Sequence, residues 1–306
     1  MADDLHGDLG ALFDRVPSLA GTPRSVQRLD GGLTNRNYKV STPGGTFVAR
    51  VFSRGAELLA INRDYEYRNT ATAAAAGAAA PVIEYRPEAG VLVIGYIEGR
   101  TFTDADVSAP GNVARVAQAC RRLHAAQPFG NDFNMFDIQR RYLALVLARR
   151  FRLPAGYAGL MPRFDAIRQA LAAHPAALVP CNNDLLAGNF IDDGDRIWLI
   201  DYEYSGNNDP CFELGNIWSE CRLDLDGLAD LVSEYYGRPL RSKVARARLL
   251  GLAAKYGWTL WGSIQASTSP LDFDFWSWAM ERYEAAAEAM TGPDFSRLLD
   301  EAQRDD

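Results

Sequence analysis

NNDLLAGN occupies positions 182–189 and is followed by the apolar run IWLI at 197–200 and then by Asp201. Asp184 and Asn189 are five residues apart, the spacing that separates the catalytic Asp from the metal-binding Asn in the catalytic loops of phosphoryl-transfer enzymes. In those enzymes a second metal-binding Asp follows a short strand, which is the position of Asp201. These three oxygen-bearing side chains predict a phosphotransferase.

Upstream of residue 100, short β-branched runs alternate with glycine-bearing turns. The runs are RSVQRL at 24–29, NYKVSTPGGTFVARVF at 37–52 and PVIEYRPEAGVLVIGYIEG at 81–99. This alternation is typical of antiparallel hairpins and predicts five strands. One helix is expected from about Glu57 to Ala79, because the segment is Ala-rich after Thr70 and Pro81 cannot continue a helix.

Downstream of Gly99 the periodicity of the apolar residues becomes helical. The helical segments are VARVAQACRRLHAAQ, FDIQRRYLALVLARRF, ARARLLGLAAKYGWTLWGSIQ and FWSWAMERYEAAAEAM. The predicted fold is therefore α+β, with a small antiparallel-sheet lobe at 1–98 and a mostly helical lobe at 99–306. A hinge at about 93–101 joins them, and ligands often bind beside such hinges, so Tyr96 and Ile97 are candidate nucleotide contacts.

Composition narrows the function classes. The chain has 306 residues, 48% of them hydrophobic, and a formal net charge of −7. This acidic balance argues against nucleic acid and anionic lipid as partners, because both require clustered Lys and Arg. Four cysteines lack the spacing of a metal site, the amino terminus is acidic, and no apolar run reaches the roughly 18 to 20 residues of a membrane span; we therefore expect a cytoplasmic protein with free thiols.

Four motifs in order resemble the choline/ethanolamine kinase family, within the protein-kinase-like and aminoglycoside-phosphotransferase-like group. They are LDGGLTNRNYKV, NNDLLAGN, IDYEYSGNNDPCFELGN and GWTLWGSIQ, spread over the chain from about Arg28 to Ala287. The resemblance implies a two-lobed kinase fold, ATP as donor, Mg²⁺ as metal and a small amino alcohol as acceptor.

The motif residues fit the chemistry of phosphoryl transfer. Asn189 and Asp201 are the expected metal ligands, because Mg²⁺ prefers oxygen donors. Asp184 is the expected catalytic residue, whose carboxylate would accept the acceptor's hydroxyl proton. Taken alone, the spacing of Asp184 and Asn189 is more typical of a solvated loop or Asx turn, and Asp201 after IWLI is what favours the functional interpretation.

Phosphate contacts are expected from the small lobe. Arg50 stands where many kinases carry a phosphate-binding lysine, and Glu66 on the following helix would pair with it. Gly31 and Gly32 would let the backbone of a turn approach the phosphates closely. In the same turn, the side chains of Thr34 and Asn35 would donate hydrogen bonds to phosphate oxygens. The alternatives are a surface glutamate and an ordinary hairpin turn.

Aromatic residues of the last helices predict the acceptor pocket. A quaternary ammonium donates no hydrogen bonds and is held by ring faces. By resemblance, Trp258, Trp261 and Trp278 match positions that line the choline pocket, and Tyr283 is a looser partner of Trp278. Core packing between two helices is the alternative for these rings. Glu203 and Glu220 are further candidates for substrate binding, because their carboxylates would add negative potential near the cation. The alternative is that each forms a structural ion pair.

Some features leave alternatives open. Where this chain has Asn182, relatives often carry a His that helps to fix the catalytic loop by hydrogen bonding, and Asn can also donate and accept such bonds. The three histidines of this chain, His6, His124 and His174, do not replace it, and we expect His124 to be a packed residue of the large lobe. A kinase of the same fold acting on an aminoglycoside or thiamine is the first alternative, and an inactive pseudokinase is the second. Residues 1–20 and 296–306 are expected to be peripheral, because both ends are acidic and poor in large apolar residues.

Overall fold

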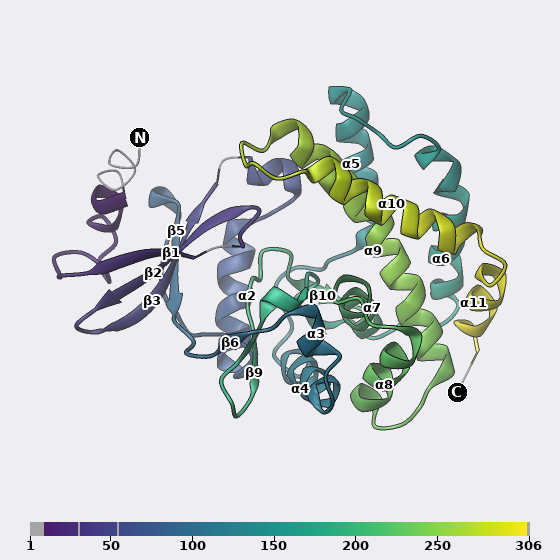
Figure 1. Cartoon of the computed structure of the whole chain (residues 1–306), viewed down its shortest axis with the longest axis horizontal. Helices are drawn as coiled ribbons and strands as arrows, with labels where there is room; N and C mark the ends of the chain where they lie inside the picture. Colours follow the sequence, from purple (N-terminus) through teal and green to yellow (C-terminus); the bar gives the residue numbers. More distant parts are fainter. Residues whose placement is uncertain (1–8, 30, 54, 305–306) are drawn as a thin grey trace.

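A five-stranded antiparallel sheet forms the amino-terminal lobe (Figure 1). This computed structural model describes residues 9–29, 31–53 and 55–304. The strand order is β1-β2-β3-β5-β4. A two-residue Pro-Gly turn joins β2 to β3, and Thr42 pairs with Gly45 across it. The five predicted strands are confirmed as β1 Ser25–Leu29, β2 Asn35–Thr42, β3 Gly45–Phe52, β4 Val82–Arg86 and β5 Val91–Gly95.

The single long helix of this lobe is shorter than expected. A 3-10 turn, η1, covers Ala56–Leu59, and α2 begins only at Arg63 and ends at Ala75. The start is fixed by Asn62, whose side chain accepts hydrogen bonds from the amides of Asp64 and Tyr65. Such capping satisfies amides that have no partner inside the helix. The predicted continuous helix from Glu57 to Ala79 is therefore wrong at both ends.

Residues 9–20 are not peripheral. Phe13, Val16 and Leu19 are fully buried and pack against one face of the sheet with Tyr38 and Val40. These three apolar side chains, spaced three residues apart, cover this face of the sheet. The prediction is wrong for 9–20, whereas 1–8 lie outside the described residues.

Helices make up most of the carboxyl-terminal lobe, with the long α9 at its centre (Figure 1). Helices packed against α9 include α5, α7 and α10. The four predicted helical segments correspond to α4, α5, α9 and α10. The helices are α3 Asp104–Val107, α4 Asn112–His124, α5 Met135–Arg149, α6 Met161–Ala172, α7 Pro210–Glu220, α8 Leu225–Tyr236, α9 Arg241–Thr268, α10 Phe275–Thr291 and α11 Phe295–Glu301.

Two small sheets lie where the lobes meet. Strands β6 Arg100–Thr101, β8 Phe190–Asp192 and β9 Ile197–Leu199 form one, and β7 Val179–Cys181 pairs with β10 Gly206–Asn208 in the other. The loop at 182–189 leaves β7 and ends in the 3-10 turn η4, Ala187–Asn189, directly before β8. The remaining 3-10 turns are η2 Pro87–Ala89 and η3 Tyr157–Leu160.

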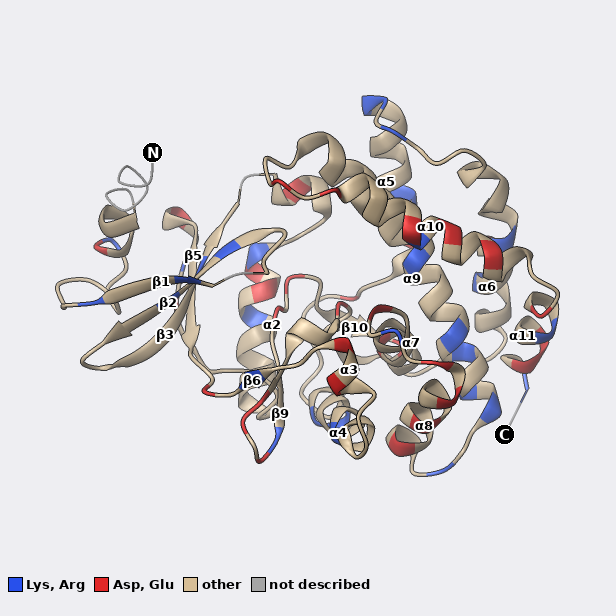
Figure 2. Cartoon of the chain, viewed as in Figure 1, with Lys and Arg blue, Asp and Glu red and all other residues tan. Residues whose placement is uncertain are grey.

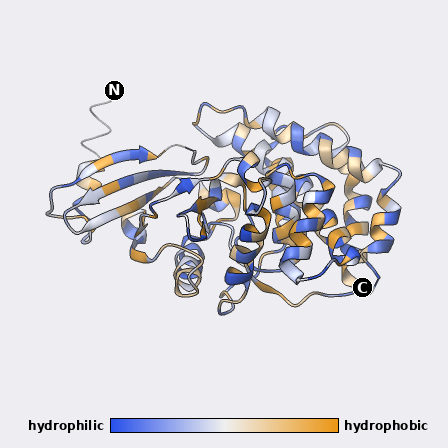
Figure 3. Ribbon diagram, turned by 60° about the horizontal axis from the view of Figure 1, so that its bottom comes forward, coloured by the Kyte–Doolittle hydropathy of each residue, from blue (hydrophilic) through white to orange (hydrophobic). Residues whose placement is uncertain are grey.

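Hydrophobic and hydrophilic residues alternate along the strands and helices (Figure 3), and acidic and basic residues are interspersed over both lobes (Figure 2). Within the described residues, every helix is too short or too polar to cross a membrane. The prediction that residues 296–306 are peripheral is wrong for the part that the structure describes, because Leu298 and Ala302 are buried in the core. The fold class is α+β as predicted; the lobe boundary near residue 98 stays a prediction.

Candidate active site

One pocket of about 420 Å³ opens between the two lobes. Its walls come from the glycine turn before β2, the 184–189 loop, the segment after β9, and the facing sides of α7, α9 and α10. Six carboxylate side chains and three basic side chains line it among the described residues. The pocket therefore combines an excess of negative charge with, as shown below, an aromatic wall.

The 182–189 loop is held by hydrogen bonds to its backbone. The Asn182 and Asn183 amides donate to the two oxygens of the buried Glu213 carboxylate, at 2.8 and 2.7 Å. Asn182 also donates from its side chain to the carbonyls of Ile200 and Asp201, both at 3.0 Å, and accepts from the Asp184 amide at 3.1 Å. Asn182 thus ties the loop to the segment carrying Asp201, the function that we had expected of a histidine there.

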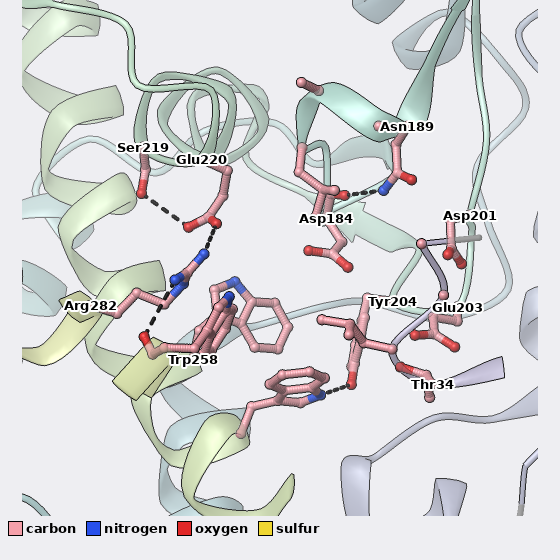
Figure 4. A pocket seen from close by; sticks show the side chains of 18 of the residues that line it. Thr34, Asp184, Asn189, Asp201, Glu203, Tyr204, Ser219, Glu220, Trp258 and Arg282 are labelled. Atoms are coloured by element: carbon pink, nitrogen blue, oxygen red, sulfur yellow. Dashed lines mark hydrogen bonds and ion pairs between the residues drawn. The ribbon is translucent and has the colours of Figure 1, made fainter. Parts of the chain in front are cut away.

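Asp184 projects into the pocket between Asp201 and Trp258 (Figure 4). Burial raises the pKa of its carboxyl well above the usual range, and the negative charges of Asp201, Glu203 and other carboxylates raise it further. A carboxylate in this environment holds a proton more readily than one in water. It is therefore suited to receive a proton from a bound hydroxyl group.

Asn189 and Asp201 present oxygen atoms to the same pocket. The Asn189 side-chain nitrogen donates to the Asp184 carbonyl at 2.7 Å, which leaves its amide oxygen available for a ligand. Asp201 lies in the left-handed region, at φ 64°, two residues after the end of β9. A carboxylate and an amide oxygen facing one cavity are hard donors that fit Mg²⁺.

Arg50 is paired with two carboxylates by one nitrogen. Its Nη1 lies 2.7 Å from Glu66 Oε1 and 2.6 Å from Asp201 Oδ1. Burial alone would lower the pKa of the guanidinium, but Asp201 and Glu66 outweigh burial and raise it above the usual range. The predicted pair of Arg50 with Glu66 is present, and Arg50 also contacts the candidate metal ligand.

Glu203 connects the lobes. Its carboxylate accepts from Asn35 Nδ2 at 2.8 Å and lies 3.3 Å from Arg63 Nη1, while Arg63 also pairs with Glu66 at 2.6 Å. Burial, followed by the charges of Asp201 and Glu66, raises the pKa of Glu203 to about 7. Glu203 was predicted either to add negative potential near the substrate or to form a structural ion pair. The structure shows the ion pair, with Arg63, in the wall of the pocket.

The glycine turn lies over the pocket, although Asp30 of this motif is outside the described residues. Gly31 has a φ of 98°, and a Cβ on Gly32 would lie 2.5 Å from the Asn35 carbonyl oxygen, so both positions require glycine. Thr34 lines the pocket as predicted. Asn35 also lines the pocket, and its amide joins the lobes: Nδ2 donates to Glu203, and Oδ1 accepts from Arg63 at 2.8 Å. Phosphate binding by the Asn35 side chain stays a prediction.

Three tryptophans form the aromatic wall. Trp258 and Trp261 project from one face of α9, and Trp278 of α10 lies 5.0 Å from Trp261 between ring centroids. Trp261 donates its indole N–H to the Tyr204 hydroxyl at 2.9 Å, and Tyr204 packs edge-on to Trp258 at 4.9 Å. All four rings line the pocket.

Tyr283 does not belong to this wall. Its hydroxyl donates to the Ala155 carbonyl at 2.8 Å, and its ring stacks near Tyr157. The neighbouring Arg282 faces the pocket instead and pairs with the predicted Glu220, whose side chain is only 5% exposed (Figure 4). A residue five positions from Trp278 lies on another side of the helix, whereas one four positions away shares its face.

Tyr96 and Ile97 do not line this pocket. Tyr96 continues the pairing of β5, because its amide donates to the Thr46 carbonyl at 3.1 Å, and the Lys39 ammonium lies 3.8 Å from its ring centroid. Their contact with a nucleotide stays a prediction.

Sequence reasoning missed Tyr204, Glu213 and Arg282 as site residues. Arg282 follows Trp278 by four residues, a spacing that could have placed it on the wall. Tyr204 and Glu213 lie inside the IDYEYSGNNDPCFELGN motif, but their partners come from distant segments.

His124 is packed in the large lobe, as predicted. Its Nδ1 lies 2.7 Å from the Tyr235 hydroxyl, and its Nε2 lies 3.6 Å from Cys181 Sγ and 3.7 Å from Glu213 Oε1. These three side chains could surround a metal ion. Glu213 already accepts two loop amides, however, so we interpret the cluster as support for the loop.

Comparisons with known proteins agree with this geometry. Residues 25–250 match the phosphotransferase enzyme family, APH. Protein LicA of Haemophilus influenzae is 28% identical over 84% of this chain and 77% of its own, and ethanolamine kinase 2 of Rattus norvegicus is 26% identical over 92% and 80%. The crystal structure of a choline/ethanolamine kinase family protein from Mesorhizobium loti superposes with a TM-score of 0.85 at 32% identity, covering 97% of this chain and 99% of that one. Similarity over nearly the whole of both chains makes this protein a member of the choline/ethanolamine kinase family, within the phosphotransferase enzyme family.

Proposed function

We propose that the protein transfers the terminal phosphoryl group of ATP to the hydroxyl group of choline or of a related amino alcohol such as ethanolamine. One observation carries this proposal. The Asp184 carboxylate faces the same pocket as the aromatic wall and the oxygens of Asn189 and Asp201. A base, a cation-binding surface and metal ligands are the three parts that such a reaction requires.

The donor end of the pocket would be built from the small lobe and the loop. Asn189 and Asp201 would hold Mg²⁺, which neutralises phosphate charge when bound. Arg50, held by Glu66, would contact the phosphates, with the backbone at Gly31 and Gly32 and the Thr34 side chain above them. Tyr96 and Ile97 would lie by the nucleotide base.

Asp184 would act at the acceptor. The acceptor's hydroxyl oxygen attacks the terminal phosphorus, the bond from that phosphorus to ADP breaks, and the hydroxyl proton passes to the Asp184 carboxylate. The raised pKa of Asp184 supports this role, because a stronger base takes the proton more readily.

The ammonium end favours choline. Faces of Trp258, Trp261 and Trp278, with Tyr204, suit a methylated cation that cannot donate hydrogen bonds. Ethanolamine would in addition use hydrogen-bond acceptors, for which Glu220 is the nearest candidate on the wall. Glu203 is engaged by Asn35 and Arg63, so we expect it to contribute charge rather than direct contact.

Two alternatives are less well supported. An aminoglycoside is polycationic and suits a pocket rich in carboxylates, but it gains less from a tryptophan wall. Thiamine carries a single positive charge and is the acceptor that the assay below must separate from choline. A pseudokinase is the alternative that Asn182 and Arg50 motivate. Against it, the Asn182 side chain donates to the Ile200 and Asp201 carbonyls and so orders the loop, and Arg50 pairs with Glu66 and Asp201.

A coupled assay with ATP, Mg²⁺ and a panel of choline, ethanolamine, thiamine and an aminoglycoside tests the proposal. We expect turnover of choline that is lost in Asp184→Ala and a raised choline KM in Trp261→Ala. Asp64→Ala is the matched control, because this exposed acid bonds only Tyr85 among the described residues and should leave turnover intact. Full activity of Asp184→Ala would discard its role, and turnover of the aminoglycoside alone would favour the first alternative.

A further inference from the structure

A cation of the protein itself already occupies the aromatic wall. The guanidinium carbon of Arg282 lies 3.4 Å from the centroid of the Trp278 ring. The same guanidinium pairs through Nη2 with Glu220, and the two side chains are only 14% and 5% exposed. Figure 4 shows this pair beside the tryptophans, facing the cavity that contains Asp184.

Trp278 and Glu220 are the groups that an acceptor's ammonium would use. A ring face and a carboxylate each attract one positive charge, and a second cation placed nearby is repelled. Arg282 therefore stands where the proposed substrate's charge would be most strongly bound. Either the guanidinium moves away when the acceptor binds, or the acceptor binds without using Trp278 and Glu220.

The contacts of Arg282 are those of a side chain that can be exchanged. Its Nε is buried without a hydrogen-bond partner among the described residues, and its Nη1 reaches the Trp278 carbonyl only at 3.4 Å. The buried Arg246 is a contrast within the same chain: its Nε lies 2.5 Å from Asp209, and its Nη1 donates to the Leu171 and His174 carbonyls. A buried donor left unpaired weakens the hold on a side chain, so Arg282 loses less on moving than Arg246 would.

We propose that Arg282 is a competitor built into the acceptor site. Its guanidinium occupies the ammonium subsite of the empty enzyme, on Trp278 and Glu220, and the cationic head of the acceptor displaces it. This inference rests on the proposed function of the pocket. It makes Arg282 a specificity-determining residue, because only a head group that gains more from the ring faces than the guanidinium does can replace it.

Direct binding of tetramethylammonium tests the competition without any phosphoryl transfer. Isothermal calorimetry would compare wild type with Arg282→Met, which keeps an unbranched side chain and removes the guanidinium and its charge. We expect roughly fivefold tighter binding of tetramethylammonium, the size of one freed cation–π contact. Arg222→Met is the matched control: it removes a charge at the exposed rim of the same pocket, pairs with Glu281, and should change the dissociation constant less than twofold.

A second background keeps the test interpretable. Arg282→Met could fail to fold because it leaves the Glu220 carboxylate buried and unpaired. In that case the comparison is between Glu220→Gln and Glu220→Gln/Arg282→Met, both of which lack the carboxylate charge. Tighter binding by the double variant than by Glu220→Gln supports the inference. Equal or weaker binding on removal of Arg282 in every background that folds overturns it and makes the arginine a structural support of Trp278.

The two proposals fail differently. A wild-type enzyme that phosphorylates choline, with no tightening on loss of Arg282, contradicts the competition alone. A wild-type enzyme that turns over no amino alcohol and binds no tetramethylammonium contradicts the proposed function and, with it, this inference.

Discussion

Replacing Asn182 by alanine should destabilise the protein and reduce turnover together. The side chain is fully buried and makes three hydrogen bonds, two to the carbonyls of Ile200 and Asp201 and one from the Asp184 amide. At ~1 kcal/mol for each lost bond, the free energy of unfolding should fall by about 3 kcal/mol. Because two of these bonds fix the backbone beside Asp184 and Asp201, we also expect kcat to fall at least roughly tenfold, the effect of misplacing catalytic groups by a fraction of an ångström.

Urea unfolding followed by tryptophan fluorescence measures the first effect, and the coupled ATP assay measures the second. Asp224→Ala is the matched control: this exposed residue caps α8 by accepting from the Gly227 amide at 2.7 Å, so its loss should cost about 1 kcal/mol and leave kcat unchanged. An Asn182→Ala enzyme that keeps wild-type kcat, or that is no less stable than the control, would refute the argument that this amide replaces a histidine in ordering the loop.

Three further outcomes are expected. Arg50→Met should lower kcat at least roughly a hundredfold while Arg50→Lys retains much of it, because both carboxylate contacts end on one nitrogen, which an ammonium can imitate; near-equal loss in the two variants would contradict this. Gly215→Ala should lower the free energy of unfolding by several kcal/mol, since its Cβ would overlap the Ala247 carbonyl where α7 crosses α9. Gly159→Ala, with open space around its Cβ, should leave the free energy of unfolding unchanged in the same urea titration. The four cysteines are buried, and burial raises the pKa of Cys211 to about 12, so a thiol reagent at pH 8 should label none of them rapidly until guanidinium unfolds the chain.

Local patterns in the sequence sufficed for much of the fold and for the catalytic loop. Strands bounded by Pro-Gly and Gly turns formed as expected, and Asp184, Asn189 and Asp201 face one pocket because a short loop and a short strand connect them. In such segments the spacing along the chain nearly determines the spacing in space. The helix after β3 was predicted too long, because alanine content indicated a helix but not the cap at Asn62.

Long-range partners could not be derived in the same way. The Asn35 side chain donates a hydrogen bond to Glu203, which lies 168 residues further along the chain, and no local pattern predicts this partner. Phe13 is the one aromatic residue between positions 9 and 20, and only the folded sheet shows the apolar face that it covers. Residue type predicted what these side chains can do, whereas the tertiary structure determined what each of them meets.

The acceptor wall shows how one residue of error changes a chemical conclusion. On a helix of 3.6 residues per turn, Arg282 is displaced about 40° from Trp278, whereas Tyr283 is displaced about 140°. The sequence therefore predicted a phenol ring where the structure has a guanidinium, and the wall carries a positive charge paired with Glu220. This wall stands on α9 and α10, whereas the proposed metal ligands Asn189 and Asp201 lie in other segments. We therefore expect substitutions at Arg282 to change which cation binds while the groups proposed for phosphoryl transfer stay in place.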